Sequence, residues 1–193
     1  MSDPYDPISR SNAARFSTVA MIGVLGLLAT LSPLSAQFVF LGGGATFPVG
    51  DYGDLADTGF LLAGGGGHPL GESGFVIGAE GFYGQNNHSD IEGDKTSPYG
   101  VMGMLQYDFA GPDARSSPYV LGEVGILWRK FSSDQFEEST DSGLGFGGAA
   151  GYHFPLGSVG GWLEGRVMHA RIDEENTTFV GLITTRISVP LGR

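Results

Sequence analysis

Seven charged side chains lie on one face of segments that otherwise alternate apolar with small residues: Glu80, Asp108, Glu123, Arg129, Glu164, Arg166 and Arg186. Paired carboxylates can perform acid–base catalysis, but three of these seven groups are cationic, and mixed signs are typical of ion pairs. We therefore predict an ion-pair network inside the protein, built from Glu80, Glu123, Arg129, Glu164, Arg166 and Arg186. A network of this kind leaves little room for a substrate, so we predict no catalytic residue and no enzyme cofactor.

The histidines lack the spacing of catalytic bases. His153 is followed by Phe154-Pro155 and His169 by Ala170-Arg171, so neither has a serine two positions on. Acyl transfer needs a nucleophile and a base at hydrogen-bond distance, and this spacing does not provide them. We predict that His68, His153 and His169 are lumen or interface residues rather than metal ligands.

The segment Asp90-Ile91-Glu92-Gly93-Asp94 is a weak candidate for a cation-binding loop. Its three carboxylates, Asp90, Glu92 and Asp94, alternate with other residues, as oxygen ligands of a divalent cation can. The segment lacks the full ligand set of a calcium loop, so no metal site is predicted with it.

The elements that carry these residues are predicted to be strands. From Phe38 onward, runs of about ten residues are apolar at every second position and are separated by Gly, Pro, Asn, Asp and Ser. We predict eight strands, at 37–47, 59–68, 74–84, 98–109, 118–131, 143–154, 161–172 and 177–190. No helical pattern separates them, which favours a closed all-β sheet: an eight-stranded antiparallel up-and-down barrel.

Glycine is the most unusual feature of the composition, with 34 residues in a chain of 193. Many of the glycines fall inside the predicted strands, as in Gly143-x-Gly145-x-Gly147. Glycine weakens an isolated strand, so we expect a packing reason, either the tight curvature of a small barrel or room for bulky inward neighbours. A glycine-rich low-complexity segment is the alternative.

The first 36 residues read as a signal peptide. Arg10 and Arg15 precede the apolar run 19–29, and small residues follow up to Ala36. We predict export, with domains at 1–36 (signal peptide) and 37–193 (barrel). A start at Met21, another cleavage position and a retained anchor helix are the alternatives, although the apolar run is shorter than the ~20 residues of a membrane span.

The predicted connectors fall into two groups. Those at 48–58, 85–97, 132–142 and 173–176 are mostly long or acidic, and those at 69–73, 110–117 and 155–160 are shorter and rich in Pro and Gly. The first group holds thirteen acidic residues and one lysine, a net charge of −12, compared with −11 for the whole chain. In an antiparallel barrel such connectors alternate between the two ends, so nearly all of the net charge is predicted at one end, where it could bind divalent cations or cell-surface partners.

The two faces of each strand differ. The face opposite the charges carries large apolar side chains, and aromatic residues gather near both ends of the runs: Phe75, Tyr107, Phe109, Tyr152 and Phe154 at one end, and Tyr83, Tyr99, Trp128 and Phe179 at the other. Aromatic belts at two boundaries are typical of a barrel that spans a membrane. We therefore predict contact with outer-membrane lipid.

With these features the chain resembles the family of small eight-stranded outer-membrane β-barrels, of the OmpA transmembrane domain and OmpX type. The resemblance covers 37–193 and rests on the strand pattern, the segment Gly44-Ala45-Thr46-Phe47-Pro48-Val49-Gly50-Asp51, the charged interior and the predicted signal peptide. It implies a monomer in the outer membrane of a Gram-negative type cell envelope, without a cofactor, acting in envelope integrity or surface interaction. One departure is the end Val189-Pro190-Leu191-Gly192-Arg193, where such proteins usually have a final aromatic residue.

Other functions remain as alternatives. A narrow porin-like channel is the first, and a lipid A-modifying barrel enzyme or a secreted lipocalin-like ligand carrier is less favoured. The carrier would need large aliphatic residues inside, whereas the predicted inner face of 143–154 is Gly145, Gly147, Ala149 and Gly151. Nucleic-acid binding is excluded, because a chain of net charge −11 without a basic patch repels phosphate.

Overall fold

The computed structural model describes residues 38–88, 94–111, 114–133, 138–172 and 175–190, the last range in backbone only for 175–184 and 190. Its strands are β1 (Phe38–Val49), β2 (Gly59–Pro69), β3 (Phe75–Asn87), β4 (Lys95–Asp108), β5 (Ser117–Ser132), β6 (Ser139–Leu156), β7 (Val159–Ile172) and β8 (Glu175–Pro190), with a 3₁₀ turn, η1 (Gly50–Tyr52), after β1. The predicted signal peptide, 1–36, lies outside the described residues.

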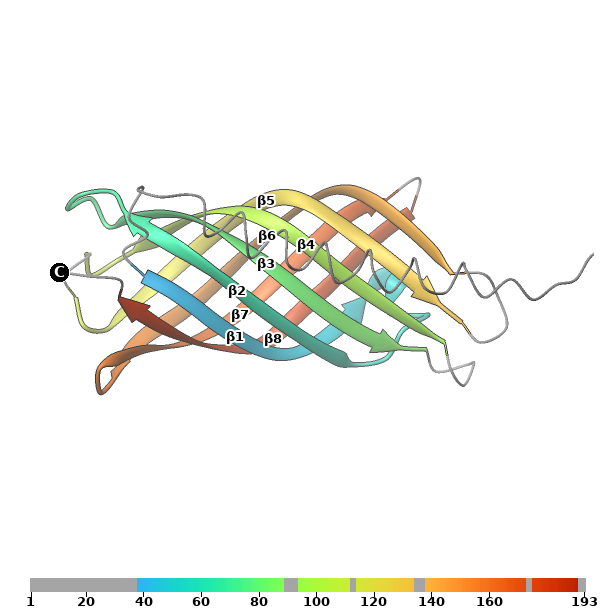
Figure 1. Cartoon of the computed structure of the whole chain (residues 1–193), viewed down its shortest axis with the longest axis horizontal. Coiled ribbons are helices and arrows are strands. Elements are labelled where there is room, and N and C mark those ends of the chain that lie inside the picture. Colours follow the sequence, from blue (N-terminus) through green and yellow to red (C-terminus); the bar gives the residue numbers. More distant parts are fainter. Residues whose placement is uncertain (1–37, 89–93, 112–113, 134–137, 173–174, 191–193) are drawn as a thin grey trace, which may run out of the picture. The chain divides into compact units, whose positions relative to one another are not determined.

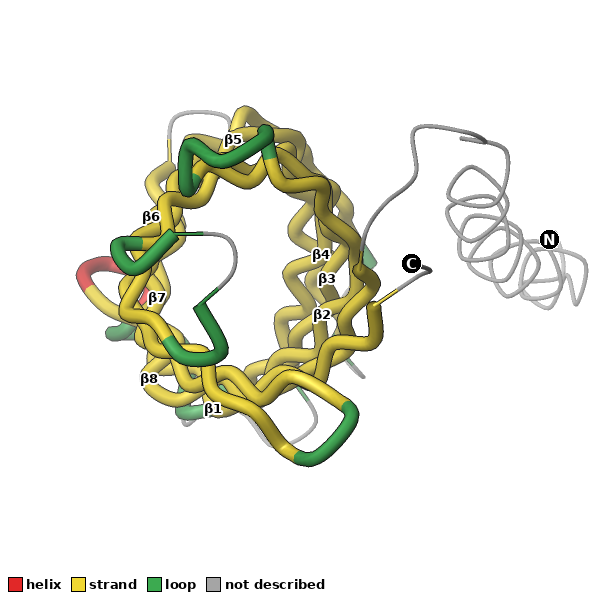
Figure 2. The backbone as a smooth tube through the Cα atoms, turned by 90° about the vertical axis from the view of Figure 1, so that its left-hand side faces the viewer, coloured by secondary structure: helices red, strands yellow, loops and turns green. Residues whose placement is uncertain are grey.

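The eight strands form one closed antiparallel ring in sequence order, and β8 pairs with β1 to complete it (Figures 1 and 2). The predicted eight-stranded antiparallel up-and-down barrel is therefore confirmed, and every predicted strand boundary lies within four residues of the observed one. Closure leaves no unpaired strand edge. The register is interrupted near Ala45 and Thr46, where β8 carries a bulge. In the described part of the chain, no helix is long and apolar enough to cross a membrane.

The two ends of the barrel are named by their connectors. The acidic end carries the connectors at 50–58, 88–94, 133–138 and 173–174, and the opposite end carries those at 70–74, 109–116 and 157–158. The alternation of long and short connectors is weaker than predicted, because pairing continues into segments that were expected to be loops. Asn87 pairs with Lys95, and Phe131 with Ser139. The hairpins are therefore longer, and the acidic residues that the structure describes in these connectors remain at one end.

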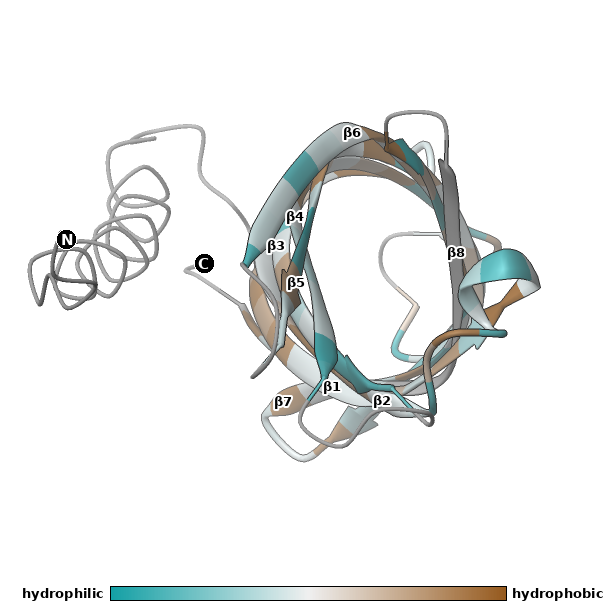
Figure 3. Cartoon of the chain, turned by 90° about the vertical axis from the view of Figure 1, so that its right-hand side faces the viewer, coloured by the Kyte–Doolittle hydropathy of each residue, from teal (hydrophilic) through white to brown (hydrophobic). Residues whose placement is uncertain are grey.

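Inward and outward residues alternate along each strand, as the pattern predicts. Along β5, for example, Leu121, Glu123 and Leu127 are buried, whereas Val124 and Ile126 are more than half exposed. The barrel therefore turns its charges inward and many large apolar side chains outward. Figure 3 shows the resulting mixture of hydrophobic and hydrophilic segments around the ring.

The interior also contains apolar layers that the sequence analysis did not predict. One cluster includes Leu61, Phe82, Met102, Leu127 and Met168 together with Tyr52 and Ala56 from the connector after β1. A second, toward the opposite end, contains Phe40, Met104, Tyr119, Leu121 and Trp162. The predicted ion-pair network therefore shares the interior with apolar side chains. A ring of eight strands is filled by side chains, and apolar ones pack there without needing partners.

Inward glycines provide the space that these side chains occupy. A Cβ atom at Gly151 would lie 2.5 Å from the Tyr119 hydroxyl, and one at Gly125 would lie 2.9 Å from Met102 Sδ and 2.0 Å from the Val101 carbonyl oxygen. These distances are below van der Waals contact. Of the two reasons expected for the glycines, room for bulky neighbours is therefore observed directly.

This packing predicts opposite effects for two glycines of β5. Gly125→Ala should lower the free energy of unfolding by about 1–3 kcal/mol, because its methyl group would overlap the backbone of β4. Gly122→Ala should leave stability unchanged or raise it by up to about 1 kcal/mol, because open space surrounds that position and alanine restricts the unfolded chain. Urea unfolding of the folded protein in lipid vesicles measures both, and equal effects would contradict the packing.

Candidate functional site: a buried ion-pair cluster

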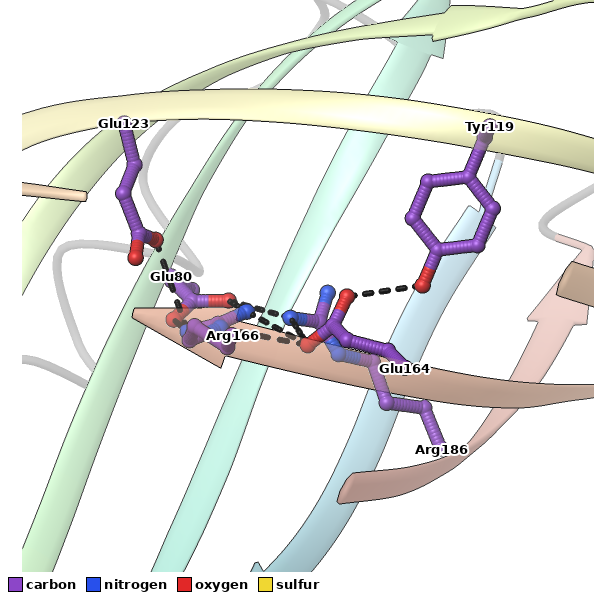
Figure 4. Close-up of polar contacts among 6 residues, drawn as sticks. All are labelled: Glu80, Tyr119, Glu123, Glu164, Arg166 and Arg186. Carbon is purple, nitrogen blue, oxygen red and sulfur yellow. Dashed lines mark hydrogen bonds and ion pairs between the residues drawn. The ribbon is translucent and has the colours of Figure 1, made fainter. Parts of the chain in front are cut away.

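Five of the six residues of the predicted network meet in the middle of the barrel: Glu80 from β3, Glu123 from β5, Glu164 and Arg166 from β7, and Arg186 from β8 (Figure 4). Each is at most 5% exposed. On β5 and β7 these residues lie between members of the two apolar clusters, since Leu121 and Leu127 flank Glu123, and Trp162 and Met168 flank Glu164 and Arg166. We call these five residues the ion-pair cluster.

Arg166 is the centre of the cluster. Its Nη1 and Nη2 donate to the two carboxylate oxygens of Glu80, the second over 3.1 Å, so the pair is bidentate. Its Nε donates to Glu164 Oε1 over 3.1 Å, and its Nη1 lies 3.4 Å from Glu123 Oε2. Planar two-point contact between a guanidinium and a carboxylate is among the stronger ion pairs in proteins, and the low local dielectric strengthens it further.

Arg186 joins two of the same glutamates from the neighbouring strand. Its Nη2 donates to Glu164 Oε1 over 2.7 Å and lies 3.2 Å from Glu80 Oε2. Its guanidinium carbon lies 4.6 Å above the centre of the Phe40 ring, a distance typical of a cation–π contact. A Cβ atom at Gly42, which pairs with Arg186, would lie 2.7 Å from Arg186 Cγ, so β1 needs glycine there.

Tyr119 is a member of this site that the sequence analysis missed. Its hydroxyl donates to Glu164 Oε2 over 2.7 Å, and the residue is 1% exposed. Tyr119 is four residues from Glu123 along β5, so the two side chains face the same side of the strand. A buried phenol also needs a hydrogen-bond partner. These two signals could have placed it inside the barrel.

Arg129 was predicted in the network but does not join the cluster. It lies on β5 near the acidic end, opposite Asp141 of β6, and it is only half-buried. Its electrostatic influence reaches Tyr52 of η1. Arg129 is an even number of residues from the buried Glu123 and Leu127 on β5, which indicates the inward face but not the height along the barrel axis.

The acidic end has its own polar contacts. Asn86 Nδ2 donates to Thr46 Oγ1 over 2.9 Å and to the Asp57 carbonyl over 2.8 Å, and these contacts hold the connector after β1 against β3. The Tyr52 hydroxyl lies 3.4 Å from Asn86 Oδ1. Burial raises the pKa of Tyr52 to about 12. The Tyr52 side chain is thus fixed in the buried layer nearest this end.

The predicted cation loop is only partly described. Asp90 and Glu92 lie outside the described residues. Asp94 is 4% exposed, and its main-chain carbonyl accepts a hydrogen bond from the His88 amide over 3.0 Å. Among the residues that the structure describes, no group of three histidine, aspartate or glutamate side chains is arranged to hold a metal ion.

A serine, a histidine and an aspartate approach one another at the opposite end. Ser117 pairs with His153 in register, and His153 Nε2 lies 3.7 Å from Asp108 Oδ1. The Ser117 hydroxyl, however, donates to the Pro118 carbonyl over 2.8 Å and accepts from the Ala110 amide over 2.9 Å, and Ser117 is fully buried. An oxygen held in this way is unsuited to nucleophilic attack, so the arrangement favours a structural role.

His68 and His169, the other two histidines of that prediction, lie on the outer surface of the barrel or at its edge. The His169 ring packs 5.0 Å from that of Phe146, which is 53% exposed. His68 lies near the end of β2 opposite Ile77, another exposed residue. His169 lies close to the ion-pair cluster in register, but it alternates with the buried Met168 and Ala170 and therefore faces away from the cluster.

The outer surface of the strands is strongly apolar. Leu41, Val124, Leu144 and Ile187 are each more than half exposed, and they come from four different strands. Aromatic rings pair between neighbouring strands toward both ends: Phe75 with Tyr107 at 4.9 Å, and Tyr99 stacked on Trp128 at 5.7 Å. Large apolar side chains exposed on this many strands are unusual for a surface that faces water.

Comparisons with known proteins agree with this architecture. The barrel matches the crystal structure of Neisserial surface protein A, with a TM-score of 0.64, 13% sequence identity, and coverage of 80% of this chain and 96% of the other. Weaker matches, each with a TM-score of 0.48, are the Ail protein of Yersinia pestis (19% identity, covering 78% and 98%) and the outer membrane protein OprG of Pseudomonas aeruginosa (14% identity, covering 81% and 97%).

No family model matches the sequence, and no curated protein is significantly similar to it. The fold is that of the small eight-stranded β-barrels, as the sequence resemblance predicted. At these identities the likeness concerns the fold alone, so the function must be argued from the residues of this chain.

The cluster predicts a large cost for removing one arginine. Arg166→Leu should lower the free energy of unfolding by about 3–5 kcal/mol, because three buried carboxylates would lose a partner. Lys130→Met is the matched control. It breaks the surface contact of Lys130 with Glu138, 2.8 Å long, and should cost less than about 1 kcal/mol. Similar losses for both variants in denaturant titrations would contradict the burial of the cluster.

The surface pair predicts a separate pH effect. The hydrogen bond from Lys130 lowers the pKa of the Glu138 carboxyl, so the small stabilisation by this pair is present above about pH 4.3, the ordinary glutamate value, and is lost as the pH falls through the lowered value. In an NMR titration, Lys130→Met should return the Glu138 pKa toward its ordinary value. An unchanged titration would show that Lys130 does not contact Glu138 in solution.

Proposed function

We propose that this protein is an integral outer-membrane barrel with a structural or surface-interaction role, carried by the residues at its acidic end. The observation that supports this most directly is the inverted arrangement of the strands. Fully buried charged groups face inward, and apolar side chains that are half or more exposed face outward. Hydrocarbon is the solvent that suits such an outer surface.

The interior favours a closed barrel over a pore. The ion-pair cluster lies between two apolar clusters along β5 and β7, and Met102, Leu127 and Met168 are each at most 1% exposed. An ion crossing the barrel would have to displace these packed side chains and lose its water. The narrow porin-like channel is therefore the less favoured function, and conductance recordings on the inserted protein test it directly.

The acidic end is the surface that we assign to interaction. Its described carboxylates include the exposed Asp51 and Asp54 near η1, and Glu138 and Asp141 at the β5–β6 hairpin. A surface with this charge attracts divalent cations and basic partner segments and repels anions. Divalent cations bridging these carboxylates to anionic lipid headgroups are one such interaction, and exposed basic segments of cell-surface partners are another.

A depth-matched pair of substitutions tests membrane insertion. Val124 lies near the middle of β5 and is 55% exposed, so Val124→Arg should destabilise the vesicle-inserted protein by about 2–4 kcal/mol. Thr140→Arg, near the acidic end of β6, should cost about 0–1 kcal/mol. A barrel in water would tolerate both, so equal small effects would contradict insertion, as would release of the native protein from membranes by carbonate.

A further inference from the structure

The ion-pair cluster has unequal numbers of opposite charges. It brings together three carboxylates, Glu80, Glu123 and Glu164, and two guanidiniums, Arg166 and Arg186. With every group ionised, the cluster would carry one uncompensated negative charge among residues that are at most 5% exposed. A lone buried charge of this kind is very costly, and proteins usually avoid it by pairing or neutralising the group.

The hydrogen bonds identify which carboxylate carries the excess. Both oxygens of Glu80 contact guanidinium nitrogens. Glu164 Oε1 accepts from both arginines, and Oε2 accepts from Tyr119. Neither oxygen of Glu123 has a hydrogen-bond partner among the described residues, although both are buried. Its contact with Arg166 is an ion pair at 3.4 Å.

The residues around Glu123 provide few hydrogen-bond donors or positive charges. Its register partners are Met104 on β4 and Gly147 on β6, which bring no side-chain donor. The charged and titratable groups that face it are Glu80 from β3, Glu164 and Arg166 from β7, and, further away, Arg186 from β8 and Tyr119 from its own strand (Figure 4). The two guanidiniums already hold two other carboxylates. Glu123 is therefore a third carboxyl group in a cluster whose guanidiniums can neutralise only two.

We infer that Glu123 binds one proton in the folded barrel near neutral pH, which leaves two carboxylates balanced by two guanidiniums. A proton is favoured over a metal ion because the described residues near Glu123 do not provide a set of ligands that could replace the hydration shell of a cation. The inference depends on the interior geometry and is independent of the role proposed for the acidic end.

Infrared difference spectroscopy of the whole protein folded in vesicles tests this directly. The wild type should show the carbonyl stretching band of a protonated carboxylic acid near neutral pH, and Glu123→Gln should remove that band. Glu138→Gln is the control, because Glu138 is an exposed, ionised carboxylate and should leave the band in place. Absence of the band in the wild type, or its persistence in Glu123→Gln, would overturn the inference.

Stability against pH gives a second readout. If the folded protein holds one more proton than the unfolded chain, the ratio of folded to unfolded wild type, relative to that of Glu123→Gln, should fall about tenfold for each pH unit from the ordinary glutamate value up to the pH at which the folded Glu123 itself loses its proton. Near neutral pH, Glu123→Gln should unfold at the same denaturant concentration as the wild type or a higher one, and Glu80→Gln at a lower one. A loss of stability in Glu123→Gln equal to that in Glu80→Gln would show that Glu123 is ionised.

A cation in place of the proton has a distinct signature. Wild-type stability would then rise in sodium or potassium chloride compared with choline chloride at equal ionic strength, and Glu123→Gln would lose that dependence. Such a result, without the acid band, would replace the proton by an alkali cation and overturn the inference as stated.

Discussion

The constraint on which the structure depends is the small bore of a closed ring of eight strands. Such a ring has an interior just wide enough for side chains to fill, so each inward residue is buried and must find a partner within the ring. In this chain the middle layer is filled by glutamates and arginines that bond to one another, with apolar layers on both sides. Removing one charged member leaves its partners buried and unpaired, which costs far more than the pair itself contributes.

The same constraint explains the unusual glycine content. Large inward residues lie opposite glycines on the neighbouring strands: Tyr119 opposite Gly151, Glu123 opposite Gly147, and Arg186 opposite Gly42. A Cβ atom at Gly147 would lie 2.6 Å from Glu123 Oε1, so even alanine there would displace the carboxyl group. Alternation of large and small inward residues across neighbouring strands lets long charged side chains reach the barrel axis, where residues from β3, β5, β7 and β8 meet.

Much of this could be predicted from the sequence, because a period of two determines both the strands and their faces. The inward position of Glu80, Glu123, Glu164, Arg166 and Arg186 follows from parity alone. The height of a residue along the barrel axis does not follow from this alternation, because it depends on strand tilt and register. For this reason Arg129 was predicted in a cluster that it does not join. The apolar layers were missed although the alternation indicates them: Leu127 is four residues from Glu123 on β5, and Met102 is six residues from Asp108 on β4, so all four face inward. Tyr52 was missed because it belongs to a connector, where no period exists.

The low identity to Neisserial surface protein A is understandable in the same terms. A TM-score of 0.64 at 13% identity indicates that the barrel can be built from very different residues. Alternation, closure and a neutral, filled interior are requirements on residue class and volume, and many combinations of side chains satisfy them. These requirements do not apply to the residues at the acidic end, except for the few that anchor the connectors, such as Asn86. The charge gathered there is not needed to build the barrel, and for this reason the acidic end is where function specific to this chain should be sought.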